Sequence, residues 1–580
     1  MVAMMGKDKS RSEIAAALGA CRGAFLWIGV FSAFINILAL SGSLFMMEVY
    51  DRVIPSGSLP TLAGLFTLVA ILYLFQGLLD LMRTRLLTRI GASLDQSLGS
   101  RVFDAVLGLQ LRAPRIGESS QPLRDLDIIR SFLSSSGPGA FFDLPWLPFY
   151  LGICFIFHPL LGLAVSCGAI FLVFLTLLTE VMSRLPTRET ARYSVSRNRM
   201  IEMSRRNAEA LVAMGMAGRV RQRFEELSRR HIDAQQSTSD TSGGFGGLSK
   251  VFRMLLQSAV LAVGAYLVIG QEATSGVIIA GSILSARALA PIDLVISNWK
   301  GFSASRQAKE RLDKLLALIP DARDPMPLPA PQFAFAVQGV AATPPEAQKV
   351  VVQDVNFVLK PGNGLGIIGP SASGKSSLAR LLVGIWSPQR GTIKLDGAPL
   401  SQWSSEALGA HIGYLPQAVE LLEGTVAENI ARFDPAATPD AIIAAAQAAF
   451  VHDMVLSLPQ GYDTVIGEQG ESLSAGQRQR LALARALYGT PFLVVLDEPN
   501  SNLDAEGEEA LTQAMLGIRA RNGIVIVIAH RPSALGAVDM VLAMAGGRQQ
   551  AFGPKDEVLS KVLQSSSGLK VVSKPAAVVS

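Results

Sequence analysis

The sequence predicts a multi-domain membrane protein in which a domain of six membrane-spanning helices is followed by an α/β domain with a phosphate-binding loop. Three observations predict this fold class. Long apolar runs recur before residue 300, a proline-rich stretch follows them, and short β-rich runs alternate with helical ones from about residue 332. The chain has 580 residues, room for more than one domain, and only 17% of them are charged, against about 25% in soluble domains.

Six apolar runs are the predicted spans, because a helix needs about 20 apolar residues to cross the hydrocarbon core. They cover approximately residues 24–47, 59–79, 144–157, 160–179, 254–270 and 276–297. The third run is short, so its helix is expected to begin earlier, around GAFFDLPW. A signal peptide is the alternative for the first run, but its apolar core exceeds the usual length of about 7–15 residues and no convincing cleavage site follows. We interpret it as an anchor.

Basic residues set the expected orientation, because cytoplasmic loops carry an excess of Lys and Arg. The long connections 81–140 and 180–253 are rich in arginine. The short connections contain only Arg52 among them: 48–58, 158–159 and 271–275. Both long connections, both chain ends and the second domain are therefore expected in the cytoplasm. The net charge of +5 fits this topology, and no aromatic-and-basic pattern suggests nucleic-acid binding.

Composition sets the expected domain boundaries. A cytoplasmic segment, 1–23, precedes a membrane domain over 24–315, and the prolines at 325, 327, 329 and 331 mark a stiff linker over 316–331. The α/β domain is expected over 332–562, where GLGIIG, FLVVLD and GIVIVIAH are typical of buried parallel strands. The tail over 563–580 is expected to be disordered.

The stretch GPSASGKSS fits G-x-x-x-x-G-K-[ST] between a predicted strand and a predicted helix, which argues against an ordinary glycine-rich turn. Gly369 and Gly374 would allow a tight loop whose amides face phosphate oxygens. Lys375 would reach the β- and γ-phosphates, and Ser376 would bind Mg²⁺. The whole expected loop is Gly369, Pro370, Ser371, Ala372, Ser373, Gly374, Lys375, Ser376 and Ser377.

The stretch FLVVLDEP is an apolar strand that ends in two acids. Asp497 would hold Mg²⁺, directly or through water, and Glu498 would polarise an attacking water. Taken alone, two acids could simply end a strand. Beside a phosphate-binding loop they predict phosphoryl transfer from ATP.

Between these motifs, LSAGQRQRLALARAL resembles the signature motif of ATP-binding-cassette (ABC) proteins. Other cassette motifs occur in the family's order: YLPQ with Gln417, SNLD with Asp504 and VIAHR with His530. The resemblance implies a cassette pair that sandwiches two ATP molecules. His530 would hold the γ-phosphate and position the water with Glu498, and Gln417 would sense Mg²⁺ and transmit closure. The nucleotide contacts implied outside the phosphate-binding loop are Ser474, Gly476, Gln477 and Asp504.

Two features depart from the family's pattern. Ala475 replaces the usual second glycine of the signature, and GVAATPPEAQKV offers no aromatic residue to stack on adenine. The remaining motifs are intact, and one membrane domain with one cassette is half a transporter. The resemblance therefore implies a homodimer with two equivalent ATP sites.

The membrane half is similar to the type I secretion exporters, in the branch that exports proteases and lipases. The segments that carry this resemblance are MMEVYDRVIPSGSLPTL, FFDLPWLPFYLGICFIFHPLLG, NAEALVAMGMAGRV and SILSARALAPIDLVISNW. It implies export of an unfolded protein with a C-terminal signal across the bacterial inner membrane, with a periplasmic adaptor and an outer-membrane channel as partners. About 23 residues precede the first span, too few for a peptidase domain, so exporters that cleave leader peptides are disfavoured.

Two alternatives keep most of this machinery. An exporter of lipid, peptide or drug would differ only in its cargo. A nucleotide-gated channel or scaffold would be expected to have degenerate catalytic residues, whereas Glu498 and His530 are both present.

Arg287 stands in the sixth run, about 16 Å along a helix from Gly276 and thus near the middle of the hydrocarbon core. Asp293, at i+6, points elsewhere on the helix, and Pro291 occupies i+4. We expect Arg287 to line the central pathway of a dimer, with Pro291 kinking the helix. A structural ion pair with another span is the alternative.

Overall fold

The computed structural model describes residues 12–112, 121–319, 326–345, 347–467, 473–529 and 532–566. The chain forms two compact units, a membrane unit and a cassette unit; the main boundary falls at residues 320–321, and a short segment that begins at Leu107 groups with the cassette unit. The main boundary lies within the expected linker, 316–331.

Among the described residues of the membrane unit, six helical segments are long and apolar enough to cross a membrane, as predicted. Four are single helices: α5 (Leu59–Arg112), α10 (Pro159–Arg206), α12 (Ala217–Ile269) and α13 (Ser275–Leu318). The first segment joins α2 (Arg22–Leu38), α3 (Ser41–Glu48), a π-helical turn (Val49–Val53) and α4 (Ile54–Ser56). The third joins α8 (Gly137–Asp143), a 3₁₀ turn (Leu144–Trp146) and α9 (Leu147–Phe157), so it does begin before the apolar run.

The long connections expected over 81–140 and 180–253 are mostly helical in the described residues and are not irregular loops. Most of these residues continue the spans as helices, because they are rich in Leu, Ala, Arg, Gln and Glu, which favour helix. Short helices complete the two connections and the N-terminal segment: α1 (Glu13–Ala20), α7 (Gln121–Leu133) and α11 (Ala208–Ala213). Sequence hydropathy marks where a helix leaves the membrane, and it gives no sign of where the helix ends.

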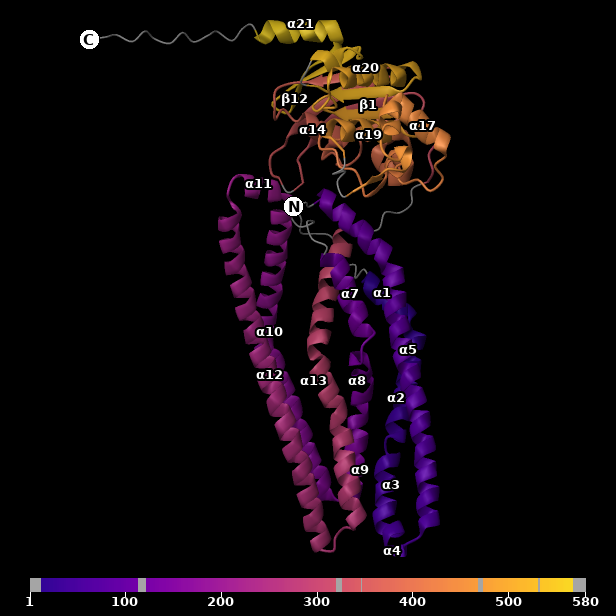
Figure 1. The fold of residues 1–580 in the computed structure, drawn as a ribbon, viewed down its shortest axis with the longest axis vertical. Coiled ribbons are helices and arrows are strands. Elements are labelled where there is room, and N and C mark those ends of the chain that lie inside the picture. Colours follow the sequence, from indigo (N-terminus) through magenta and orange to yellow (C-terminus); the bar gives the residue numbers. More distant parts are fainter. Residues whose placement is uncertain are drawn as a thin grey trace, which may run out of the picture. The chain divides into compact units, whose positions relative to one another are not determined.

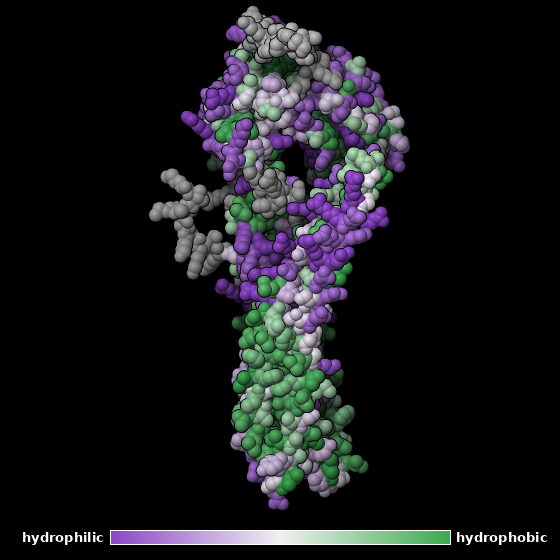
Figure 2. All heavy atoms as spheres, turned by 90° about the vertical axis from the view of Figure 1, so that its left-hand side faces the viewer, coloured by the Kyte–Doolittle hydropathy of each residue, from purple (hydrophilic) through white to green (hydrophobic). Residues whose placement is uncertain are grey.

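Within the membrane unit, α10 and α12 lie side by side, and α13 runs along α7, α8 and α9 (Figure 1). Leucine, valine and isoleucine side chains from α9, α10, α12 and α13 form a buried apolar cluster around Tyr150. On the face seen in Figure 2, hydrophobic side chains form a broad band over the helices, and hydrophilic side chains dominate beyond one end of it. This pattern matches spans that continue into water.

The cassette unit is built on a ten-stranded sheet with the order β5-β4-β1-β2-β12-β11-β3-β10-β9-β6. Its strands are β1 (Phe335–Ala342), β2 (Val352–Leu359), β3 (Gly364–Ile368), β4 (Arg390–Leu395), β5 (Ala398–Pro399), β6 (Ile412–Leu415), β9 (Leu493–Asp497), β10 (Ile524–Ile528), β11 (Met540–Ala545) and β12 (Arg548–Pro554). A separate pair joins β7 (Gly424–Thr425) and β8 (Val465–Ile466). The three predicted strands are β3, β9 and β10, which pair in parallel and are buried.

Helices surround this sheet (Figure 1). They are α14 (Lys375–Leu382), α15 (Ser405–His411), α16 (Val426–Ile430), α17 (Pro439–Ala448), α18 (His452–Leu456), α19 (Ala475–Leu487), α20 (Ala505–Ala520) and α21 (Lys555–Ser566). Because α21 extends to Ser566, the first residues of the expected disordered tail, 563–580, are helical. Residues 567–580 lie outside the described part of the chain.

Candidate ATP site

The predicted catalytic motifs follow neighbouring parallel strands of the cassette sheet. The phosphate-binding loop follows β3, Asp497 ends β9, and Gln417 comes two residues after β6. These strands lie in the order β3, β10, β9, β6, and all pair in parallel. Their carboxyl ends therefore meet at one edge of the sheet, where α/β proteins bind ligands. His530 would follow β10 at the same edge, but it lies outside the described residues.

Two glycines allow the phosphate-binding loop to adopt its path. Gly369 has φ +152° and Gly374 has φ +93°, values that favour glycine. A Cβ atom at Gly369 would collide with the carbonyl oxygen of Met544, and one at Gly374 with that of Val351. Gly374 also caps the N-terminus of α14, whose free amides attract anions. The loop has the close backbone approach that phosphate binding requires.

Two polar side chains fit a phosphate in this loop. The hydroxyl of Ser373 is buried and has no hydrogen-bond partner among the described residues. The Nζ atom of Lys375 donates to the carbonyl oxygens of Gly369 (2.8 Å) and Pro370 (2.9 Å). Burial lowers the pKa of the Lys375 ammonium, which nearby Asp497 and Glu498 partly offset. A phosphate would supply the missing partner of Ser373 and an anionic partner for Lys375.

Ser376 and Asp497 form the candidate Mg²⁺ site. The Ser376 hydroxyl donates to Oδ1 of Asp497 at 3.2 Å, and Asp497 is only 2% exposed. Burial raises the pKa of Asp497, although the Ser376 hydrogen bond acts in the opposite direction. A hydroxyl and a carboxylate are the oxygen ligands that Mg²⁺ takes, and a buried carboxylate gains most from a cation. Gln417, the third predicted ligand, is exposed in the loop that follows β6.

Glu498 is held in an unusual backbone conformation beside Asp497. Its φ is +53°, and its amide donates to the carbonyl oxygen of Ile528 at 3.1 Å. A non-glycine residue in this region is strained, and such strain gathers at active sites.

Sequence reasoning missed Gln479, which is 4% exposed. Its Nε2 atom donates to the carbonyl oxygen of Glu498 (3.4 Å) and to that of Pro499. Gln479 therefore links α19 to the turn that carries the predicted base. The signal was present in the sequence, since a glutamine on the apolar face of a helix needs a polar partner.

The signature and D-loop residues sit at two helix N-termini. The Ser474 hydroxyl accepts from the amide of Gln477 (3.2 Å), and Gln477 Oε1 accepts from the amide of Ser474 (2.9 Å), which caps α19 reciprocally. Asp504 caps α20 by accepting from the amide of Gly507 at 2.9 Å. Gly476 lies close to Asn502: a Cβ atom added at Gly476 would be 3.1 Å from the carbonyl oxygen of Asn502. Gln477 and Asp504 thus have local structural roles at the starts of α19 and α20.

Arg287 is exposed on α13 and has no hydrogen bond or ion pair among the described residues. Asp293 instead pairs with Arg253 of α12, with 2.6 Å between Arg253 Nη1 and Asp293 Oδ2. Helix α13 continues through Pro291, which is buried. Because proline has no amide hydrogen, the carbonyl oxygen of Arg287 lacks its helical donor.

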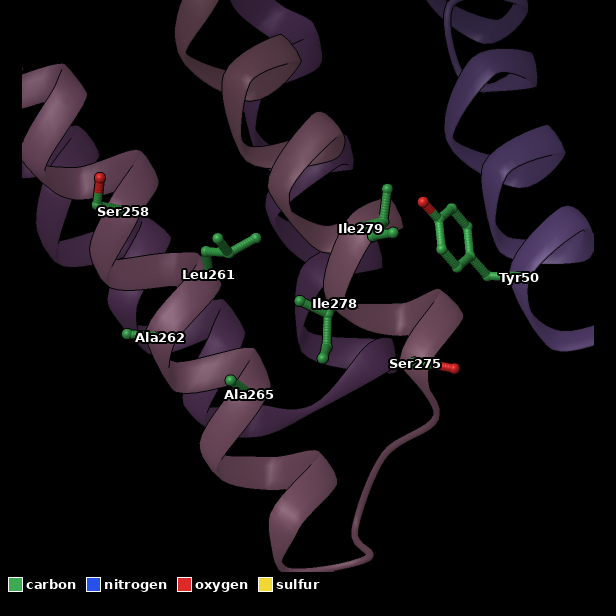
Figure 3. Close-up of a pocket in the computed structure, with 8 residues that line it drawn as sticks. All are labelled: Tyr50, Ser258, Leu261, Ala262, Ala265, Ser275, Ile278 and Ile279. Carbon is green, nitrogen blue, oxygen red and sulfur yellow. The ribbon is translucent and has the colours of Figure 1, made fainter.

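An apolar cavity of the membrane unit contains no catalytic chemistry. It measures about 460 Å³ and lies between α12, α13 and the π-helical turn, where Leu261 points toward α13 and Tyr50 points toward Ile279 (Figure 3). Beside it, Asp51 accepts from Thr274 (2.6 Å) and from the amide of Gly276 (2.8 Å), which caps α13. This region joins the first and sixth spans and offers no group for phosphoryl transfer.

Comparisons with known proteins agree with this geometry. Residues 25–291 match the family model of the ABC transporter transmembrane region, and residues 352–501 match that of the ABC transporter. The chain is 54% identical over 576 residues to the type I secretion system ATP-binding protein PrsD of Rhizobium meliloti strain 1021, covering 98% of this chain and 99% of that protein. It is 29% identical over 561 residues to the leukotoxin translocation ATP-binding protein LktB of Mannheimia glucosida, covering 94% of this chain and 77% of that one.

A solved structure supports the fold. A bacterial Atm1-family ABC exporter with ATP bound superimposes with a TM-score of 0.80 at 22% identity, covering 96% of this chain and 100% of that chain. At this identity the match concerns the fold alone.

Proposed function

The chain belongs to the ABC transporters, among the type I secretion ATP-binding proteins, and we propose that its cargo is an unfolded protein with a C-terminal signal. It is an inner-membrane protein that binds ATP in a cytoplasmic cassette and couples ATP hydrolysis to protein export. The observation that carries this conclusion is the intact sheet edge with Lys375, Ser376, Asp497 and Glu498, on the same chain as six spans. The cargo class rests on the resemblance of the membrane segments to protease and lipase exporters.

The positions of Lys375, Ser376 and Asp497 support their proposed roles, and the roles of Gln417, Glu498 and His530 rest on the family resemblance. Lys375 leaves the carbonyl oxygens of its own loop and binds the β- and γ-phosphates. Ser376, Asp497 and Gln417 would hold Mg²⁺, which would neutralise phosphate charge. Glu498 polarises the attacking water, with His530 at the γ-phosphate.

We propose a homodimer in which each α19 faces the nucleotide of the partner. Ser474 is exposed at the N-terminus of α19, where the helix dipole favours an anion. Ser474 and Gly476 would contact the γ-phosphate, while Gln477 and Asp504 hold the adjoining helix starts. Membership of a type I secretion system implies a periplasmic adaptor and an outer-membrane channel as partners.

Arg287 is our candidate for the cargo pathway. Its guanidinium lies on an exposed face of the sixth span. The backbone carbonyl oxygen of Arg287 also lacks a helical donor, because Pro291 has no amide hydrogen. A charged side chain at this depth should face protein or water rather than lipid. A water-filled route for a polypeptide between two copies of the chain would satisfy both groups.

The test combines a gene deletion with a cargo swap. Mass spectrometry of the medium identifies the protein that disappears when the gene is deleted, and its C-terminal segment is then fused to a reporter. Wild-type protein should restore secretion of the reporter, and Glu498→Gln should not, because turnover falls by a factor of about 10²–10⁴ without the base. Glu557→Gln, at an exposed position of α21, is the matched control and should secrete normally.

Secretion of the reporter without its C-terminal segment would contradict the proposed cargo signal. Undiminished secretion by Glu498→Gln would contradict the coupling to hydrolysis. If deletion changes only lipid, peptide or drug efflux, the chain is an exporter of another cargo.

A further inference from the structure

A second cavity of the membrane unit, here called the basic pocket, is lined by several cationic residues and by many residues with hydroxyl groups. It measures about 460 Å³ and lies between α10, α12 and α13. Four basic residues line it, and serine and threonine side chains form much of the remaining wall. The basic residues are Arg184, Lys250, Arg253 and Lys300. Such a wall offers many hydrogen-bond donors to an anion.

The two acids of the basic pocket are already engaged. Asp293 pairs with Arg253 at 2.6 Å, and Glu180 accepts a hydrogen bond from the indole nitrogen of Trp299. The other three cations, Arg184, Lys250 and Lys300, have no ion pair or hydrogen bond among the residues that the structure describes. The basic pocket therefore has an excess of positive charge that no described residue of the membrane unit pairs with.

A buried hydroxyl points to a missing ligand atom in the same place. The Oγ atom of Ser183, in the wall of the basic pocket, is buried and has no hydrogen-bond partner among the described residues. An orphaned hydroxyl costs free energy unless a ligand or a water pairs with it. An anionic oxygen bound by Lys250 or Lys300 would supply that partner.

Helix lengths place the basic pocket at the cytoplasmic surface of the bilayer. Lys250 lies 19 residues from the end of α12 at Ile269, about 29 Å along the helix. Lys300 lies about 38 Å from the start of α13 at Ser275, and Arg184 about 38 Å from the start of α10 at Pro159. The hydrocarbon core is about 30 Å thick, so these cations reach the phosphate level of the inner leaflet.

Apolar side chains beside the basic pocket continue toward the hydrocarbon. On α10, Leu177, Val181 and Leu185 are each more than half exposed and lie on one helix face. On α12, Val251 and Leu255 are exposed in the same way. A molecule with an anionic head in the basic pocket could lay acyl chains along these faces.

We propose that the basic pocket binds the phosphate headgroup of an anionic phospholipid from the cytoplasmic leaflet. Cationic pockets between spans at this level suit anionic headgroups, and tryptophan is enriched at the same depth. An acidic segment of the exported protein would satisfy the cations equally well. An acidic peptide segment would leave the apolar faces that lead into the bilayer uncovered, whereas the acyl chains of a lipid would cover them. This difference favours a lipid. The proposal depends on membrane insertion and not on the cargo.

The test measures lipid binding by purified full-length protein. Native mass spectrometry in detergent follows titrations with phosphatidylglycerol and phosphatidylcholine. Wild-type protein should prefer phosphatidylglycerol, and each of Arg184→Gln, Lys250→Gln and Lys300→Gln should weaken that binding about fivefold. The triple variant should lose the preference, and Lys250→Arg should keep it.

A matched triple variant removes the same charge elsewhere on the same three helices: Arg188→Gln, Arg223→Gln and Lys314→Gln. These side chains are exposed outside the basic pocket, so the variant should keep its preference for phosphatidylglycerol. Equal melting temperatures of both triple variants in phosphatidylcholine vesicles show that folding is intact. If the pocket triple does not fold, the three single variants carry the test.

Three results would overturn the proposal. Wild-type protein that shows no preference for phosphatidylglycerol would do so, as would equal losses in the two triple variants. The third is normal lipid preference in the pocket triple with lost protein secretion, which would assign the cations to the acidic cargo.

Discussion

In the cassette unit the chemical groups are positioned by the backbone of neighbouring strand ends, whereas in the membrane unit side chains on distant helices position one another. Ser376 and Asp497 meet because β3 and β9 both flank β10 in parallel. Glu498 follows directly, and its backbone amide donates a hydrogen bond to the carbonyl oxygen of Ile528. Each of these residues lies in a short motif, and the sheet brings the motifs together.

The membrane unit holds its polar groups by pairing across spans. Asp143 of α8 accepts from Asn36 of α2 (2.8 Å) and from Arg83 of α5 (2.9 Å), and Tyr150 donates to the carbonyl oxygen of Asn36 (2.8 Å). In a low-dielectric bundle a charge needs such a partner. A change in a cassette motif should therefore alter ATP binding or hydrolysis, while a change in a cross-span pair should alter the folding of the membrane unit.

The sharpest test of the cassette side is Gly374→Ala. At φ +93° a Cβ would be strained and would collide with the carbonyl oxygen of Val351, at a cost of about 3 kcal/mol. We expect the loop to shift and ATP affinity to fall about 100-fold, measured by nucleotide titration of the purified protein.

The matched control is Gly517→Ala, an exposed position of α20 with open space around its Cα. Alanine favours helix over glycine by about 0.5–1 kcal/mol, so this variant should be slightly more stable and bind ATP normally. Unchanged ATP affinity in Gly374→Ala would show that the loop conformation does not depend on this glycine.

On the membrane side, Arg253, which is paired, should behave differently from Arg287, which has no ion pair among the described residues. Arg253→Ala leaves Asp293 without its cation, and we expect a loss of about 1–3 kcal/mol, since the pair is partly exposed. Expression and melting temperature in detergent should fall. Arg287→Ala breaks no pair among the described residues, so it should fold and hydrolyse ATP normally but secrete less protein.

The reverse pattern, in which Arg287→Ala loses expression or dimerisation, would assign Arg287 to a structural pair with the partner chain. Equal loss of secretion and ATPase activity in that variant would remove Arg287 from the cargo pathway.

The same contrast explains what the sequence could predict. Local signals sufficed for the six spans, the strands β3, β9 and β10, and the phosphate-binding loop, because hydropathy and motifs are properties of contiguous residues. The sequence could not predict the partners of two aspartates, because those partners are distant in the chain. Arg253 is 40 residues from Asp293, and Asn36 is 107 residues from Asp143. The ends of the helices beyond the membrane could not be predicted for another reason. An arginine-rich helix and an arginine-rich loop have the same hydropathy, so hydropathy does not distinguish them.

The smallest effect we predict is a pH-dependent change in stability at Asp497. Burial raises the pKa of this carboxyl above that of an unfolded aspartate, so the folded protein binds the proton more tightly. The free energy of unfolding therefore falls as the pH rises from about 3.9 through the raised pKa. Asparagine cannot ionise and can still accept the hydrogen bond from Ser376.

At neutral pH and without nucleotide, Asp497→Asn should thus melt at a higher temperature than the wild type, and the difference should shrink as the pH is lowered. Asp556→Asn, at an exposed position of α21, should show no such gain. Melting curves of the full-length protein across pH, with and without Mg²⁺ and ATP, measure both effects. Mg²⁺ and ATP should raise the melting temperature of the wild type more than that of Asp497→Asn. The charged Asp497 carboxylate can bind Mg²⁺, whereas the neutral asparagine side chain lacks that attraction. A lower melting temperature for Asp497→Asn at every pH would mean that this buried charge stabilises the cassette even without its ligand.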